Sequence, residues 1–209
     1  MHSTESPREL ASAGRAAKGH SMNMEAPCPI PDGLCADESF RLAIYESGHA
    51  LTARALGIDI IHVRMRPRPP TLASDKTISG NGIDGLLKTL ENRVIELFGG
   101  QIAEEHLCGT NSCCSGDVAR IDELCSLIAG LSGSGDKDDV WFELEDTALA
   151  IFKDQAYRDA ILPIATFLND QVEAGATEID GALIDAELNK FLPKTSKKKG
   201  SFGGFLFGR

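Results

Sequence analysis

Two adjacent glycines inside a long helical pattern place the strongest constraint on how this chain folds. Apolar residues recur every three to four positions between Asp84 and Leu107, which predicts one amphipathic helix, and Gly99-Gly100 lies within it. A glycine inside a helix costs on the order of 1 kcal/mol relative to alanine, so a pair indicates that another backbone packs closely there. Ser47-Gly48, in an earlier helical segment, supplies matching small residues. We therefore expect these two helices to pack together at the small residues.

Helical periodicity extends over most of the chain and predicts a mainly α fold. The first helix is expected to begin after the N-cap Asp37 and to stop at Gly57. Further helices are expected from Asp117 onward and over three later segments, which makes about six helices in all: Asp139–Lys153, Tyr157–Val172 and Asp180–Leu192. A small β ribbon is predicted between the first and second helices, from Ile58–Arg66 and Thr77–Ser79, with Pro67–Asp75 as a surface loop.

The length and composition favour one folded domain between two tails. With 209 residues, of which 42% are hydrophobic, the chain can bury one sizeable core, which we place at residues 37–192. Residues 1–36 mix Ser, Pro, Gly, Lys and Glu without periodicity and are predicted to be a disordered lead-in. Residues 193–209 are basic and then rich in Gly and Phe, and are predicted to be a disordered tail.

Charge, hydropathy and cysteine placement exclude several classes of protein. A net charge of -10 argues against a nucleic-acid partner, because phosphate binding requires clustered Lys and Arg. No stretch reaches the roughly 18 apolar residues of a membrane span, and no secretion signal begins the chain, so we expect no membrane partner and a soluble, cytoplasmic protein. The six cysteines do not form a compact disulfide framework and are predicted to be reduced thiols: Cys28, Cys35, Cys108, Cys113, Cys114 and Cys125.

The first helix carries most of a zinc-protease motif, Tyr45-Glu46-Ser47-Gly48-His49. In the pattern His-Glu-x-x-His, two histidines four positions apart hold zinc on one helical face, and the glutamate takes a proton from the metal-bound water. Glu46 therefore matches the catalytic base and His49 the second ligand, while Tyr45 stands where the first histidine is expected. Tyr45 and His49 still project from one face, one turn apart.

The run Tyr45–Leu51 resembles the zinc helix of FtsH-type proteases, the membrane-bound AAA+ metallopeptidases, whose motif is His-Glu-x-Gly-His-Ala. Leu97–Glu105 resembles the Gly-Gly-Arg-x-Ala-Glu-Glu helix of that family, and Ser115–Ala119 resembles its Gly-Ala-x-x-Asp-Leu segment. The likeness covers roughly Asp37–Leu192, nearly the whole folded part. It implies a helical peptidase domain with zinc as cofactor, Asp117 as the third zinc ligand and a polypeptide substrate.

The chain departs from the family in three ways. Tyr45 replaces the first histidine, and Gln101 replaces the usual arginine. The chain has no Gly-x-x-x-x-Gly-Lys-Ser/Thr phosphate loop, so no ATP or other cofactor site is expected besides zinc, and any AAA+ ATPase would have to be a separate partner. The transmembrane anchor of the family also has no counterpart in the sequence.

Tyrosine is a poor substitute for histidine as a zinc ligand. A phenol ionises near pH 10 and must lose its proton to bind zinc well, whereas imidazole offers a neutral lone pair near pH 7. With His49 and Asp117 as the remaining ligands, zinc affinity should fall far below that of a three-ligand site. Four other side chains could rescue a metal site, although each also fits a structural role: Cys113, Cys114, His106 and His62.

Two acids follow the glycine pair by about one helical turn. Glu104 and Glu105 are each consistent with a solvated helix face. Because the glycine pair should bring this helix against the first one, we also expect one of these carboxylates to orient His49.

These observations leave two functions of different class open. The chain is either a stand-alone, catalytically impaired zinc peptidase with Glu46 as base, or a non-catalytic relative that binds peptides or a protein partner on the same scaffold. A structural adaptor without a groove is a variant of the non-catalytic function, and an oligomer is compatible with every one of these functions. The functional interpretation depends on His49 and Asp117 pointing at a common spot beside Glu46.

Overall fold

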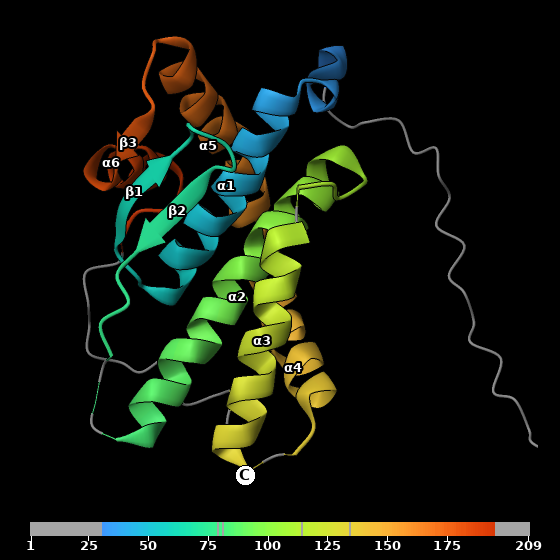
Figure 1. Ribbon diagram of the computed structural model, residues 1–209. Helices are drawn as coiled ribbons and strands as arrows, with labels where there is room; N and C mark the ends of the chain where they lie inside the picture. Colours follow the sequence, from blue (N-terminus) through green and yellow to red (C-terminus); the bar gives the residue numbers. More distant parts are fainter. Residues whose placement is uncertain (1–30, 79, 81, 114, 134, 195–209) are drawn as a thin grey trace, which may run out of the picture.

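Asp37 begins the helix around which the fold is built. The computed structural model describes residues 31–194 except 79, 81, 114 and 134, and its first α-helix, α1, spans Glu38–Leu56 (Figure 1). The Asp37 carboxylate accepts hydrogen bonds from the backbone N–H groups of Ser39 and Phe40, and Gly57 ends the helix in the left-handed conformation with φ 71°. Both predicted ends of the helix are confirmed, and α1 is buried along most of its length.

The second helix, α2, spans Ile83–Cys108 and packs against α1 at the small residues. A Cβ atom added at Gly48 would lie 2.7 Å from the carbonyl carbon of Gly99, and one added at Gly99 would lie 2.7 Å from the carbonyl oxygen of Gly48. The predicted close approach is confirmed. Asp84 lies in the first turn of α2 but is not its cap, because the N-cap position belongs to Gly82.

Four further helices complete the described part of the chain and confirm the mainly α prediction. They are α3 (Ser115–Ser132), α4 (Lys137–Ile151), α5 (Gln155–Glu173) and α6 (Gly181–Phe191). Asp136, Asp154 and Asp180 cap the N-termini of α4, α5 and α6 with their side chains. Helix α5 runs alongside α1, while α3 and α4 pack on α2 and on each other (Figure 1).

A three-stranded antiparallel sheet lies beside α1 (Figure 1). Its strands are β1 (Ile60–Arg64), β2 (Thr71–Ser74) and β3 (Glu178–Asp180), in the order β2-β1-β3. The sheet corrects the predicted ribbon in two respects. The segment predicted as a surface loop contains β2, because Leu72 and Ser74 turn inward and are buried, whereas Thr77 and Ile78 lie outside the strands and Ser79 outside the described residues.

The third strand comes from a distant part of the chain. β3 lies outside the predicted ribbon and just before the last helix, where it pairs with β1, and Ile179 between its two exposed neighbours is buried. A three-residue strand with one inward-facing isoleucine is too short to show the alternation of apolar and polar residues by which a strand is predicted from sequence.

The segment just before α1 also differs from the prediction. Pro31–Ala36, the end of the predicted disordered lead-in, forms a 3₁₀ helix, η1, and Leu34 packs partly against the core. Residues 1–30 and 195–209 of the two predicted tails lie outside the described residues. None of the helices in the described ranges is long and apolar enough to cross a membrane.

The expectation of reduced cysteines is wrong for one pair. Cys35 in η1 and Cys108 at the end of α2 form a disulfide, with their Cα atoms 5.7 Å apart. The pairing of α1 with α2 brings the start of one helix to the end of the other, so residues 73 positions apart in the chain become neighbours. Cys113 and Cys125 are free thiols, and Cys28 and Cys114 lie outside the described residues.

Candidate functional site

Side chains from three helices and one strand meet around a small cavity of about 50 Å³. The cavity is lined by Glu46, His49, Pro70, Thr71, Leu72, Arg93, Leu97 and Asp117. The Nε2 atom of His49 on α1 lies 3.2 Å from Oδ2 of Asp117 on α3. The predicted convergence of these two residues is therefore confirmed, and Glu46 stands at the same cavity.

Tyr45 completes this arrangement from the turn before His49. Its hydroxyl group donates a hydrogen bond of 2.7 Å to Oδ2 of Asp117, the same oxygen that His49 approaches. The two rings meet edge to face with centroids 4.8 Å apart. The three positions that the resemblance assigns to zinc ligands thus contact one another directly, and we refer to Tyr45, His49 and Asp117 as the triad.

The glycine pair sets the position of the triad as well as the helix packing. A Cβ atom added at Gly100 would lie 2.7 Å from Nε2 of His49 and 2.8 Å from Cε1 of Tyr45. Only a residue without a side chain leaves room for both rings between α1 and α2. The second glycine therefore serves the site, while Gly99 serves the contact between the two backbones.

Both ring nitrogens of His49 face acceptors. Nδ1 lies 2.8 Å from the carbonyl oxygen of Glu96, which can only accept, so Nδ1 carries a proton. Burial raises the pKa of the Asp117 carboxyl, but hydrogen bonds from His49 and Tyr45 outweigh it and hold that pKa below its usual range. Nε2 therefore faces a carboxylate and carries the second proton.

The pKa of His49 agrees with this doubly protonated form. Burial lowers the pKa, but the hydrogen bond with Asp117 and the nearby Glu46 carboxyl raise it to about 9. A protonated imidazole has no lone pair to offer a metal, since a ligating histidine must be neutral.

Glu46 is the least satisfied polar group at the cavity. Its side chain is 2% exposed, and Oε2 has no hydrogen-bond partner among the described residues. Burial raises the pKa of this carboxyl to about 7, because the charged form is poorly solvated and the attraction of His49 compensates only in part. Glu46 can thus exchange a proton near neutral pH, which suits a general base.

Glu96 is a residue of the site that the sequence interpretation missed. It is 1% exposed, accepts a hydrogen bond from Nδ1 of His49 through its backbone, and accepts two more through its carboxylate. The carboxylate is bound by Arg93 on the same helix at 2.6 Å and by Ser74 on β2 at 2.9 Å. The available signal was a glutamate inside the apolar run Val94–Phe98, where a charged side chain requires buried partners.

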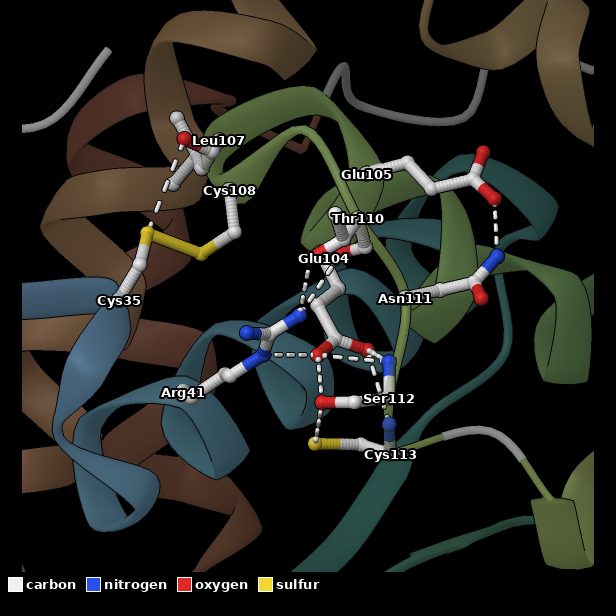
Figure 2. A network of polar contacts seen from close by, with 10 residues as sticks. All are labelled: Cys35, Arg41, Glu104, Glu105, Leu107, Cys108, Thr110, Asn111, Ser112 and Cys113. Atoms are coloured by element: carbon white, nitrogen blue, oxygen red, sulfur yellow. Dashed lines mark hydrogen bonds and ion pairs between the residues drawn. A yellow bond between two sulfur atoms is a disulfide. The ribbon is translucent and has the colours of Figure 1, made fainter. Parts of the chain in front are cut away.

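Glu104 and Glu105 lie away from His49. Glu104 is fully buried and accepts hydrogen bonds from Arg41 and from the backbone N–H groups of Ser112 and Cys113 (Figure 2). Glu105 accepts hydrogen bonds from Gln101 and Asn111. The prediction that one of these acids orients His49 is not supported, because the carbonyl group of Glu96 takes that place.

The residues considered for metal rescue are also placed elsewhere. His62 lies in β1, 3.8 Å from Glu178, and His106 is exposed late in α2. Cys113 belongs to the hydrogen-bond network around Glu104, and Cys114 lies outside the described residues. Across the described part of the chain, no three His, Cys, Asp or Glu side chains are grouped so that they could hold a metal ion.

The donor set therefore does not fit a catalytic zinc centre. Such a centre needs three good protein ligands and an open position. Here Tyr45 occupies one of the three ligand positions, and its hydroxyl group donates a hydrogen bond to Asp117. No protein-family model and no curated protein matches this sequence.

Proposed function

We propose that this chain is a relative of the FtsH-type peptidase domain that has lost zinc-dependent hydrolysis and acts as a binding module for a polypeptide or a protein partner. The observation that carries this proposal is the pair of contacts to one oxygen of Asp117, from Tyr45 at 2.7 Å and from His49 at 3.2 Å. In this arrangement the proton on His49 offsets the negative charge of the Asp117 carboxylate, and the hydroxyl group of Tyr45 donates a hydrogen bond to it. In a zinc peptidase the metal ion would offset this charge.

The cost of restoring a metal at this place supports the proposal. Zinc would have to displace the Nε2 proton of a histidine whose pKa is raised to about 9 and the proton of a phenol that ionises near pH 10. Near pH 7, each proton that zinc must displace lowers the zinc affinity about tenfold for every unit by which the pKa of that group exceeds the pH. The remaining pair of ligands would bind zinc weakly.

The size of the cavity favours a polypeptide or protein over an enclosed small molecule. Pockets that enclose small ligands measure about 300–1,000 Å³, whereas this cavity of about 50 Å³ has room for only a few water molecules. A partner would therefore lie over the site, across the half-buried Pro70 and the exposed Thr71 beside it, with few of its atoms entering the cavity.

One observation favours the second candidate, a weak zinc peptidase. The unpaired Oε2 of Glu46 stands at the cavity with a pKa of about 7, as a base for a bound water would. A hydrolase of this kind would need Tyr45 to bind the metal as a phenolate.

Metal content and peptide hydrolysis distinguish the two candidates. We expect the purified wild-type chain to hold no stoichiometric zinc and to leave casein intact, and Tyr45→His to bind zinc with at least about a hundredfold higher affinity, since it supplies a third neutral ligand. The double variant Tyr45→His/His49→Ala is the matched control and should lose this gain. Stoichiometric zinc in the wild type, with casein cleavage that disappears in Glu46→Gln, would show that the protein is a peptidase.

A further inference from the structure

The Cys35–Cys108 disulfide lies beside a buried ion pair that joins the same two elements. Cys108 is the last residue of α2, and Glu104, one helical turn earlier, is paired with Arg41 near the start of α1 (Figure 2). Cys35 precedes α1 by three residues. The covalent link and the ion pair thus fix the end of α2 against the start of α1 on successive turns.

The ion pair in turn holds the segment that follows α2. The Glu104 carboxylate accepts hydrogen bonds of 3.1 Å from the N–H groups of Ser112 and Cys113, and one of 3.0 Å from the Ser112 hydroxyl. Arg41 donates hydrogen bonds to the carbonyl oxygen of Thr110 at 3.0 Å and to its hydroxyl at 2.7 Å. Two side chains therefore determine the path of residues 109–113 (Figure 2).

This segment leads directly into the site. Asp117 lies four residues after Cys113, in the first turn of α3, where it receives the hydrogen bonds of Tyr45 and His49. Arg41 and Glu104 thus contact the part of the chain that precedes α3, the helix that carries Asp117.

We propose that the Cys35–Cys108 disulfide is a redox-controlled lock on residues 109–113, and that a dithiol reductant opens it and releases this segment, which precedes the helix that carries Asp117. The first thiolate of the dithiol attacks the sulfur of Cys35, forms a mixed disulfide and expels Cys108 as a thiolate, which takes up a proton. The second thiol of the reductant then displaces Cys35, so the reductant leaves as a disulfide. Two electrons and two protons are transferred to the two cysteines.

The environment of the cysteines fits an external reductant. Cys35 is only partly buried, whereas Cys108 is buried, so an attacking thiol reaches Cys35 first. The two free thiols in the described ranges cannot easily open the bond themselves, because burial and neighbouring carboxyl groups raise the pKa of Cys113 and Cys125 to about 11 and leave little thiolate near pH 7. These two thiols therefore compete poorly with an external dithiol.

The disulfide would control how well this segment is ordered whether the site hydrolyses peptides or only binds them. Its test is hydrogen–deuterium exchange on the full chain, with and without dithiothreitol, beside peptide mapping of the Cys35–Cys108 link. We expect reduction to speed amide exchange in residues 109–113 by about tenfold or more, since local opening no longer has to work against the cross-link, and to leave α5 unchanged.

Two variants provide the controls. Cys35→Ser/Cys108→Ser should exchange rapidly in this segment without dithiothreitol and should not respond to it, while Cys125→Ser should behave like the wild type. If the double variant does not fold, the wild-type comparison alone decides. The proposal is overturned if the linked peptide is absent or if reduction leaves exchange in residues 109–113 unchanged. It is also overturned if α5 opens to the same extent, because the disulfide would then stabilise the whole fold.

Discussion

The hydroxyl group of Tyr45 on α1 donates a hydrogen bond of 2.7 Å to the carboxylate of Asp117 on α3, although the two residues are 72 positions apart in the chain. The bond links the first turn of α3 to α1. Because Oδ2 of Asp117 also lies 3.2 Å from His49, one carboxylate oxygen organises all three members of the triad. The contribution of this bond to stability can be measured.

Removing the hydroxyl group of Tyr45 should destabilise the protein. We expect Tyr45→Phe to lower the free energy of unfolding by about 1.5–3 kcal/mol, the range for a hydrogen bond to a charged group, because Asp117 would lose one of the two groups that approach this oxygen. Urea denaturation gives the value. Tyr157→Phe on α5 is the matched control and should change the stability little, since within the described ranges no hydrogen bond involves its hydroxyl group. Equal losses in the two variants would contradict the role of the triad.

A methyl group at the crossing of α1 and α2 should force the two helices apart. We expect Gly48→Ala to lower the free energy of unfolding by about 1–3 kcal/mol, because its Cβ would collide with the backbone of Gly99. Gly130→Ala in α3 is the control, since a Cβ there meets nothing within 4 Å, and it should raise stability by up to about 1 kcal/mol through helix propensity. Thermal unfolding of both variants tests the difference in sign.

The packing of α1 on α2 could be predicted because a glycine pair inside a helix is costly unless another backbone packs against it. Gly99-Gly100 and Ser47-Gly48 carry that information in the local sequence, and the resemblance then indicated Asp117 as the third member of the site. The convergence of His49 on α1 and Asp117 on α3 was expected from that resemblance, not from the α1–α2 glycine contact.

What could not be predicted depends on contacts between distant segments. The strand β3 is three residues long and is stabilised by its partner β1, and the Cys35–Cys108 bond forms only because the α1–α2 packing brings both residues to one end of the fold. Glu96 was not identified as a site residue because a glutamate in an apolar run indicates a buried charge but not where it lies, and its partner Ser74 comes from β2, a distant part of the chain.

The buried carboxylate of Glu96 should contribute more to the free energy of unfolding than an exposed carboxylate in an ion pair of the same spacing. We expect Glu96→Gln to cost about 2 kcal/mol or more, since it leaves the Arg93 guanidinium at the cavity without its charged partner. Glu123→Gln removes a pair of the same i,i+3 spacing with Arg120, but both side chains are exposed, so its cost should stay below about 0.5 kcal/mol. Chemical denaturation of the two variants gives the comparison, and equal costs would contradict the burial argument.

The stability of the protein should fall as the pH rises from about 4.5 to about 9. The folded state holds a proton on Glu46 up to a pKa of about 7, against 4.5 when exposed, and on His49 up to about 9, against 6.5. In both intervals the folded chain binds more protons than the unfolded chain, so the stability contributed by each group is complete below its unfolded pKa and is lost as the pH passes its folded pKa. Urea midpoints at about pH 5, 7 and 9 should decrease in that order.

Glu46→Gln separates the two groups in this profile. Glutamine stays neutral, so the variant should lose the decline between about pH 4.5 and 7. It should keep only a reduced part of the decline above about pH 6.5, because the Glu46 charge that helps to raise the pKa of His49 is gone while Asp117 remains. Since one pKa unit corresponds to about 1.4 kcal/mol, Glu46 alone should account for about 3 kcal/mol of the wild-type decline. Glu123→Gln should leave the whole profile unchanged. A variant that retains the full decline below pH 7 would mean that Glu46 titrates at its ordinary pKa and is not held protonated by burial beside the triad.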